Sequence, residues 1–309
     1  MAKWLPSLNQ VLGAHNSRRA HDSRTVSHET RTKRAEVLEK GFRDLQKLGF
    51  KLDTVHQFKE RHMTALGNQW ESQGLASKTI QDRVSIFRTF SEWVGKKGMI
   101  RESHHYVTNP ESVKVSSGAK TDKTWSGHGV DLQAKVTEVA GHDPRVAIQL
   151  ELQESFGLRA KESWMLQPRL ADEKHYLTLT RGTKNGRPRT IPIRTTHQRD
   201  VLERAKMLAE RPIDSTMPPD KTLKQWKNHY YHIVRSHRIT RKADGVTSHG
   251  LRHEHLNRVY EQVAGHRSPI KGGLVVDREL DQAARQVVAQ VSGHSRPSIS
   301  SKYVGNRRG

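Results

Sequence analysis

A stretch without apolar periodicity, residues 103–126, divides the chain and constrains its fold more than any other feature. It is rich in His, Ser, Lys, Thr and Gly and contains one Asn-Pro, as linkers often do. Apolar residues recur at helical spacing before it, whereas the residues after it include an alternating, strand-like pattern. The sequence therefore predicts a basic flexible arm over 1–29, a domain over 30–102, a linker over 103–126 and a second domain over 127–309.

The first domain is predicted to contain only helices. Apolar side chains repeat at helical spacing over residues 30–48 and over about 55–73. The clearest helix begins at Ser77, a plausible N-cap, and its apolar positions follow at steps of about 3.5 residues as far as Val94. Gly95 then ends it. These helices predict a compact all-α domain with basic outer faces.

The second domain is predicted to be mainly helical with one small sheet. Two alternating segments, 175–180 and 189–193, flank an Asn-Gly pair, which is a strong signal for a β-hairpin. Helices are expected at 131–140, 143–156, between Gly157 and Pro168, and at 196–210, 223–236, 248–264 and 279–291. The predicted fold class is therefore mainly α, with an all-α N-terminal domain and an α+β second domain that holds a small antiparallel sheet.

The charge of the chain indicates its partner. Lys and Arg number 54 against 32 Asp and Glu, which gives a net charge of +22. Such an excess favours nucleic acid, because neutralising phosphates releases counterions. An anionic membrane is the alternative, but the mean hydropathy is −0.83 and no apolar run approaches the roughly 18 residues of a spanning helix. The first residues also lack the apolar core of a signal peptide, so a cytoplasmic location is expected.

The absence of cysteine limits the possible chemistry. It excludes disulfides, thiolate zinc sites and cysteine nucleophiles. The 19 histidines leave a His/carboxylate metal site open, although none of them falls in a His-Glu-x-x-His arrangement.

Four short segments of the second domain place cationic or imidazole groups at a helix start or a turn. Taken singly, each is explained by an ordinary solvated surface residue in so basic a chain. His249 and Arg252 are three residues apart, so that a helix brings them onto one face. The candidate residues are Arg159, Lys184, His249, Arg252, and the pair His294 and Tyr303.

Taken together, these segments resemble the tyrosine recombinases, the phage-integrase family. Residues 157–162 match its Gly-Leu-Arg-x-x-Glu segment, Lys184 its hairpin lysine, and residues 249–253 its His-x-Leu-Arg-His. Gly293 and His294 are followed, nine positions after the histidine, by Tyr303. The resemblance covers about 125–305. It implies a catalytic domain of the DNA breaking-rejoining type, preceded by the family's SAM-like core-binding domain.

The resemblance also implies a role for each residue. Tyrosine, with a pKa of about 10, is a poor nucleophile at neutral pH, and attack on a phosphodiester builds negative charge that pre-placed cations can stabilise. Neither a metal nor a nucleotide cofactor is implied, because the covalent intermediate keeps the phosphodiester energy. The implied roles are a phosphate clamp for Arg159 and Arg252, a hydrogen bond from His294, nucleophilic attack for Tyr303, protonation of the leaving 5′ oxygen for Lys184 and assisted proton transfer for His249.

The family resemblance sets an expected function. The chain is expected to be a site-specific DNA recombinase of a mobile element, acting on duplex attachment sites as a homotetramer through a Holliday junction. We expect it in the bacterial cytoplasm, associated with the nucleoid and with no membrane partner; an accessory directionality factor is left open. The alternatives are a type IB topoisomerase, which shares this active site, and a non-catalytic DNA-binding regulator.

Two features depart from the family pattern. Forty-one residues separate Arg252 from His294, and the surplus lies in 265–278, which its Gly and Pro content predicts to be a loop. We expect a tolerated surface insertion, with contact to DNA or a partner as the alternative. Only six residues follow Tyr303. So short a tether predicts a nucleophile that stays mobile until DNA and neighbouring protomers order it.

Overall fold

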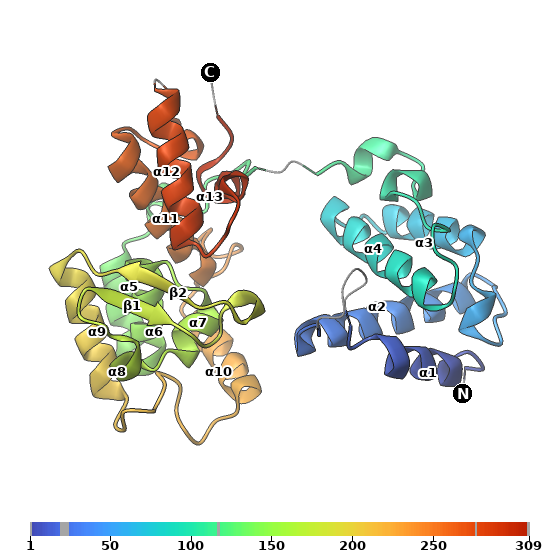
Figure 1. Cartoon of the computed structure of the whole chain (residues 1–309), viewed down its shortest axis with the longest axis horizontal. Helices are drawn as coiled ribbons and strands as arrows, with labels where there is room; N and C mark the ends of the chain where they lie inside the picture. Colours follow the sequence, from blue (N-terminus) through green and yellow to red (C-terminus); the bar gives the residue numbers. More distant parts are fainter. Residues whose placement is uncertain (1, 19–24, 116–117, 276, 308–309) are drawn as a thin grey trace. The chain divides into compact units, whose positions relative to one another are not determined.

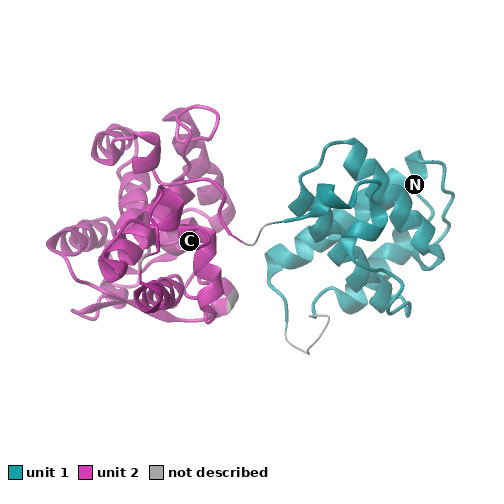
Figure 2. Cartoon of the chain, turned by 90° about the horizontal axis from the view of Figure 1, so that it is seen from above, with its two compact units in different colours: residues 1–115 teal, residues 116–309 magenta. Residues whose placement is uncertain are grey.

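The computed structural model describes residues 2–18, 25–115, 118–275 and 277–307. Figures 1 and 2 show that the chain folds into two compact units, Met1–Val115 (unit 1) and Ser116–Gly309 (unit 2). Part of the predicted arm, residues 19–24, lies outside the described residues. Among the described residues, no helix is both long and apolar enough to cross a membrane.

Unit 1 is entirely helical in its described part, as predicted. Its core is aromatic: Phe58 contacts Phe87 and Phe42 with ring centroids 5.2 and 5.8 Å apart, and Phe42 lies 5.5 Å from Phe90. Such rings bury large apolar areas; Phe42 packs edge to face on Phe58 and Phe90, whereas Phe58 and Phe87 are tilted by 30°. The helices are α1 (Leu5–His15), α2 (His28–Lys47), α3 (Glu60–Ser72) and α4 (Ser77–Trp93). A short 3-10 turn, Val55–Gln57, lies between α2 and α3, and two more, Ser103–Tyr106 and Pro110–Val113, follow α4.

The prediction of a flexible arm is wrong for α1. Trp4, Leu8 and Val11 are buried in the core of unit 1, and Trp4 contacts Phe42. These residues recur at helical spacing, so they form one apolar face of the helix. The many polar residues around them hid this stripe in the sequence.

The first half of the predicted linker belongs to unit 1. Tyr106 is buried in its core, and the Glu71 carboxylate accepts hydrogen bonds from the backbone of 108–109 and from the Ser112 hydroxyl. Polar contacts of this kind leave no periodic pattern in a sequence. The predicted N-cap is also wrong: Ala76 takes that position, and Ser77 Oγ donates to the carbonyl of Ser112 at 2.5 Å.

Unit 2 confirms the prediction of a mainly helical domain with one hairpin. Strands β1 (Tyr176–Leu179) and β2 (Arg189–Pro192) pair antiparallel, with Leu177 opposite Ile191. The helices are α5 (Leu132–Ala140), α6 (Pro144–Phe156), α7 (Ala160–Met165), α8 (Pro168–Ala171), α9 (Thr196–Leu208), α10 (Leu223–Ser236), α11 (Ser248–Ala264), α12 (Arg278–Val291) and α13 (Ser301–Val304). The second half of the predicted linker is part of this unit, because Trp125 is buried in its core.

Helix α6 is the centre of unit 2. It packs against α5, α9 and α11, and the whole of its length from Val146 to Phe156 is buried. The Asp143 carboxylate caps its first turn by accepting from two backbone N–H groups, as its sequence predicts. Gly157 ends it with a φ of +62°, a left-handed conformation that suits glycine. This turn leads directly into Arg159 and α7.

Helices α11, α12 and α13 form the other part of unit 2. Figure 1 shows α11 and α12 side by side, with α13 next to them. Between α11 and α12 lies the predicted insertion, which contains the 3-10 turn Pro269–Lys271. The expectation of a merely tolerated surface loop is wrong for Ser268 and Pro269, which are buried.

Candidate active site

A buried carboxylate, Glu162, lies at the centre of the candidate site. It is the third residue of α7, where it accepts a hydrogen bond from the backbone N–H of Arg159 at 2.7 Å. It also accepts from Arg159 Nη1 at 2.7 Å and from both terminal nitrogens of Arg189 at 2.6 and 2.8 Å. Arg252 Nη1 lies 3.9 Å away. Three guanidinium groups therefore surround a single negative charge.

The environment of Glu162 keeps it ionised. Burial opposes the charged form, but the hydrogen bonds and charge of Arg189, with the charges of Arg159 and Arg252, outweigh burial and lower the pKa of Glu162 to about 2. At neutral pH the cluster thus retains an excess of positive charge next to α11 and α13.

Arg252 is held rigidly beneath Tyr303. Its side chain is fully buried, and it donates to the backbone carbonyls of Gly157 and of Ser292, the latter at 2.7 Å. Its Nε donates to the Tyr303 hydroxyl at 3.3 Å, and its Cζ lies 5.4 Å from the centre of that ring. Burial lowers the pKa of Arg252 to about 10, so the group is still charged at pH 7.

Arg159 is the more accessible arginine of the cluster. Its side chain is 21% exposed, and Nη2 lies 3.2 Å from the Ser292 carbonyl and 3.4 Å from Nε2 of His294. The Ser292 carbonyl therefore joins the two guanidinium groups. It lies at the end of α12, where Gly293, with a φ of +72°, turns the chain towards His294.

The two candidate histidines are neutral at pH 7. Burial, followed by the charge of Arg159, lowers the pKa of His294 to about 4. The surrounding protein also desolvates the His249 ring, although this residue still reaches solvent at the start of α11. With the charge of Arg252 added, the pKa of His249 falls to about 4. A neutral imidazole can either accept or donate a proton in a reaction.

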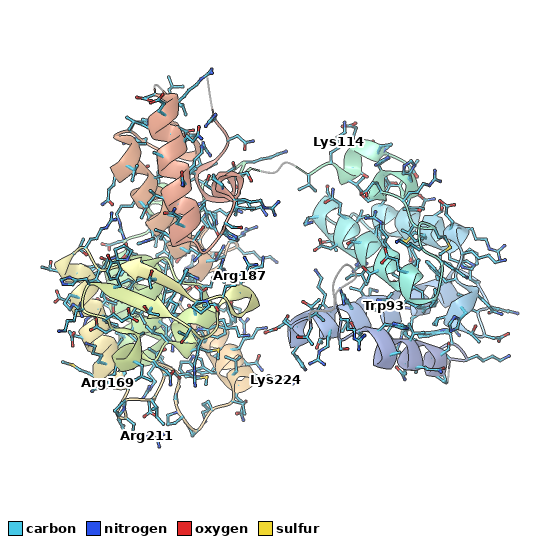
Figure 3. The ribbon with its side chains drawn as sticks, in the orientation of Figure 1. Trp93, Lys114, Arg169, Arg187, Arg211 and Lys224 are labelled. Atoms are coloured by element: carbon cyan, nitrogen blue, oxygen red, sulfur yellow. The ribbon has the colours of Figure 1, made fainter. Side chains whose placement is uncertain are left out.

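Lys184 lies apart from the buried cluster. It begins the turn between β1 and β2, its side chain is exposed, and its charge contributes to the lowered pKa of His294. Arg187, labelled in Figure 3, follows in the same hairpin and is also exposed. The hairpin thus carries two long, exposed cationic side chains, Lys184 and Arg187, at the edge of the fixed arginine cluster.

Tyr303 is ordered by the chain's own helices. It is only 7% exposed, and its ring lies 5.0 Å from that of His253 in α11. The Asn257 side chain donates to its backbone carbonyl at 3.2 Å. The prediction of a nucleophile left mobile by its short tether is therefore wrong for this structure, because α11 and α12 hold the segment from both sides of its backbone.

The structure thus brings Arg159, Arg252, His294 and Tyr303 into one contact network, with His249 and Lys184 at its edge. Sequence reasoning did not single out Glu162 as a site residue, although it stands in the quoted Gly-Leu-Arg-x-x-Glu segment. Arg189 was missed entirely. Its only signal was its position at the start of a hairpin strand, which does not distinguish it among 54 basic residues.

Comparison with known families identifies the chain. Residues 12–100 match the model of the phage integrase N-terminal domain, and residues 111–258 match that of the integrase domain. The chain belongs to the phage-integrase family of tyrosine recombinases. It is a site-specific DNA recombinase, and neither a topoisomerase nor a non-catalytic regulator is favoured. The second match ends before His294 and Tyr303, so these two residues rest on motif and geometry.

Solved structures of integrases share the fold. A lambda integrase (75–356) dimer bound to a COC′ core site has a TM-score of 0.61 and 16% identity, covering 100% of this chain and 96% of that one. The Tn1549 transposon integrase (aa 82–397) in complex with circular intermediate DNA gives 0.59 and 13%, covering 98% and 96%. No match is found among curated protein sequences. At these identities the likeness concerns the fold alone.

Proposed function

We propose that this integrase cuts duplex DNA with Tyr303 and holds the cut strand as a 3′-phosphotyrosyl ester. The observation that carries the proposal is the hydrogen bond from Arg252 Nε to the Tyr303 hydroxyl, at 3.3 Å. The guanidinium is already fixed by the carbonyls of Gly157 and Ser292, so it does not need to reorganise during the reaction. Pre-positioned donors of this kind are the main source of electrostatic stabilisation in enzymes.

The proposed cleavage is an exchange of one phosphate ester for another. The Tyr303 oxygen attacks the phosphorus and forms a new P–O bond, while the bond to the 5′ oxygen breaks and the electron pair leaves with that oxygen. Arg159 and Arg252 face the non-bridging oxygens, where negative charge develops, and His294 donates a hydrogen bond to them. Because Tyr303 covers the buried Arg252, a phosphate that reaches this arginine takes the place of the phenol on Nε, and the phenol stays beside it to attack.

Two protons must move during this exchange. His249 is the proposed aid to removal of the phenolic proton: its pKa, lowered to about 4, leaves the ring neutral at pH 7 and able to accept a proton, and it lies on the helix that carries Arg252. Lys184 is the proposed acid that protonates the leaving 5′ oxygen, and its exposed place on the hairpin suits contact with a bound strand. Both side chains are exposed.

Rejoining reverses the same step with a 5′ hydroxyl from a second duplex. We propose that four protomers exchange strands in this way at attachment sites of a mobile element, through a Holliday junction. A lambda integrase tetramer bound to a Holliday junction shares the fold, with a TM-score of 0.57 and 15% identity over 95% of this chain and 77% of that one. The DNA substrate would place the integrase in the bacterial cytoplasm, at the nucleoid.

Trapping the intermediate tests the proposal. A nicked suicide substrate with the attachment site loses a short 5′ fragment after cleavage, so a covalent protein–DNA adduct accumulates. The wild type should form this adduct, whereas Tyr303→Phe should form none and still bind the DNA. Tyr176→Phe, which alters an exposed tyrosine of β1, is the matched control and should react at the wild-type rate. An adduct that persists in Tyr303→Phe contradicts the proposal.

A further inference from the structure

The inserted segment between α11 and α12 is connected to the backbone of Tyr303 by two buried polar side chains. Asn257, in α11, donates from Nδ2 to the carbonyls of His253 at 2.8 Å and of Tyr303 at 3.2 Å. Its Oδ1 accepts from the hydroxyl of Ser268, in the insertion, at 2.5 Å. Asn257 and Ser268 are both fully buried.

The partners of Asn257 fix the orientation of its amide. A carbonyl oxygen can only accept, so the two carbonyls must face the NH₂ group rather than Oδ1. Oδ1 must then face Ser268, whose hydroxyl is the donor. Without that hydroxyl, Oδ1 of Asn257 is a buried acceptor that has lost its donor. An unpaired buried acceptor costs free energy, so rotation of the amide becomes more favourable. A rotated amide would set an oxygen against the Tyr303 carbonyl.

Ser268 is itself held in place by the insertion. Its backbone N–H donates to Glu261 Oε1 at 3.1 Å, and its carbonyl accepts from the N–H of Gly273 at 3.0 Å. A Cβ at Gly273 would lie 1.8 Å from the carbonyl oxygen of Arg267, so only glycine fits this turn. Lys271 pairs with Glu254 of α11 at 3.4 Å. Residues 267–273 of the insertion therefore form a closed turn that is bonded to α11.

The insertion also touches the chain just after the nucleophile. A Cβ at Gly305 would lie 3.0 Å from the backbone nitrogen of Ile270 and 3.2 Å from its Cβ. Gly305 has a φ of +82°, and its carbonyl accepts from Arg285 Nη1 of α12 at 3.0 Å. The segment that carries Tyr303 is thus confined between the insertion and α12.

We propose that the insertion positions the nucleophile: Ser268 orients the Asn257 amide, which holds the Tyr303 carbonyl and so sets the phenol against Arg252. Ser268 and Asn257 are positioning residues, because they act through the Tyr303 backbone. The inference rests on the proposed role of Tyr303 as nucleophile. The inserted turn that holds Ser268 would then have a function in the reaction, because it positions Tyr303.

Ser268→Ala tests the inference by removing one hydroxyl. Misplacing a reacting group by about 1 Å can cost a factor of about 100 in rate, so we expect adduct formation on the suicide substrate to slow roughly 10- to 100-fold under single turnover. The affinity for the same DNA should not change. Ser91→Ala is the matched control, because Ser91 is a buried serine of unit 1 whose hydroxyl donates only to the Phe87 carbonyl, at 2.9 Å. It should react at the wild-type rate.

Asn257→Asp separates positioning from a general loss of stability. As a carboxylate, the new side chain repels the carbonyls of His253 and Tyr303, whereas the protonated acid can donate to one of them. Burial raises the pKa of such a carboxyl. The rate of the variant relative to the wild type should therefore rise as the pH falls from 8 to 6, while its fraction folded, followed by circular dichroism, does not.

The outcomes decide between the two proposals. An adduct in Tyr303→Phe overturns the assignment of the nucleophile. If Tyr303→Phe forms no adduct but Ser268→Ala reacts as fast as Ser91→Ala, or if the deficit of Asn257→Asp does not change with pH, the positioning role is overturned. A slow Ser268→Ala with wild-type DNA affinity, together with a pH-dependent Asn257→Asp, supports it.

Discussion

The cores of the two units are built from different groups. Unit 1 packs Phe42, Phe58, Phe87 and Phe90 against one another, and its buried Asp44 pairs with an exposed lysine, Lys40, at 3.3 Å. Unit 2 instead buries charges of both signs beside one another, and Glu162 and Arg252 are both fully inaccessible. The first core consists mainly of groups that gain free energy on leaving water, whereas the second contains a cluster of groups that lose it unless each is paired.

The difference shows where the chain accepts a cost in stability. Buried ion pairs are often no more stabilising than apolar replacements, so their presence indicates a role other than stability. In unit 2 they fix cations beside Tyr303 and His294. Unit 1 is also basic, with 20 Lys and Arg against 12 Asp and Glu, but its core is mainly aromatic and aliphatic.

The largest expected effect separates these two cores. Glu162→Gln leaves the buried guanidinium groups without their negative charge, and breaking a buried ion pair in this way costs about 3–5 kcal/mol. We expect the free energy of unfolding of unit 2 to fall by that amount, as measured by denaturant titration, and adduct formation to be severely reduced.

Phe87→Ala is the counterpart in unit 1. It removes a fully buried ring, at a cost of about 3–5 kcal/mol. Because the cost falls on the apolar core, we expect the folded variant at saturating DNA to form adduct at a rate close to that of the wild type. A Glu162→Gln protein as stable as the wild type would remove the distinction between the cores.

The next effect concerns rate rather than stability. Arg252→Lys keeps a positive charge, but one ammonium group cannot hold the carbonyls of Gly157 and Ser292 and also face Tyr303. We expect adduct formation to slow by about 10²–10³, the usual cost of one pre-positioned donor. Arg204→Lys, which breaks a bidentate pair with Glu151 at 2.6 and 2.7 Å, is the control and should retain wild-type rates. Equal rates in the two variants would contradict a special role for Arg252.

The smallest effect is a difference in acid sensitivity. Burial is the first cause of a pKa of about 3 for both His253 and His255 in unit 2, and of about 4 for His62 in unit 1. The unfolded chain binds these protons at higher pH than the folded one. Stability is therefore fully present above about pH 6.5 and is lost as the pH falls towards these lowered values.

Between about pH 6.5 and 5.5, Glu162 is ionised in both the folded and the unfolded state, and the histidines set the slope of stability against pH. Each buried histidine contributes at most about 1.4 kcal/mol per pH unit, so His253 and His255 together should lower the stability of unit 2 by up to about 2.7 kcal/mol per pH unit, and His62 that of unit 1 by up to about 1.4. His249 and His294, whose pKa values are also lowered to about 4 but whose side chains are less buried, add a smaller amount to the slope of unit 2. Thermal unfolding of the two units, followed by limited proteolysis at several pH values, measures both slopes. If the free energies of unfolding of the two units fell equally with pH, the buried histidines of unit 2 would not be neutral.

Much of the fold could be predicted from local patterns. The apolar repeat in α4, the cap and proline at the start of α6 and the Asn-Gly between the strands all act within a few residues, and the structure confirms each of these elements. The helix α1 was missed because its apolar stripe is short. The turns over 103–113 were missed because Glu71, far away in the sequence, satisfies their backbone.

The site was predictable only in part. Its six residues could be named from motif order, and the structure brings Arg159, Arg252, His294 and Tyr303 into contact. The pairing of Arg189 with Glu162 could not be foreseen, because nothing in the neighbouring sequence distinguishes a buried arginine from the many exposed ones. The same is true of Ser268, whose role depends on a hydrogen bond to another helix. The catalytic roles of the six residues named from the motifs stay predictions.

The central claim is that the fixed arginine cluster serves a tyrosine that becomes bonded to DNA. The most direct measurement is to isolate the adduct from the suicide substrate, digest both protein and DNA, and locate the link by mass spectrometry. The account predicts a phosphate bonded to the peptide that contains Tyr303, with the 3′ end of the cleaved strand attached. A link to another residue, or to the 5′ end of the strand, would contradict it.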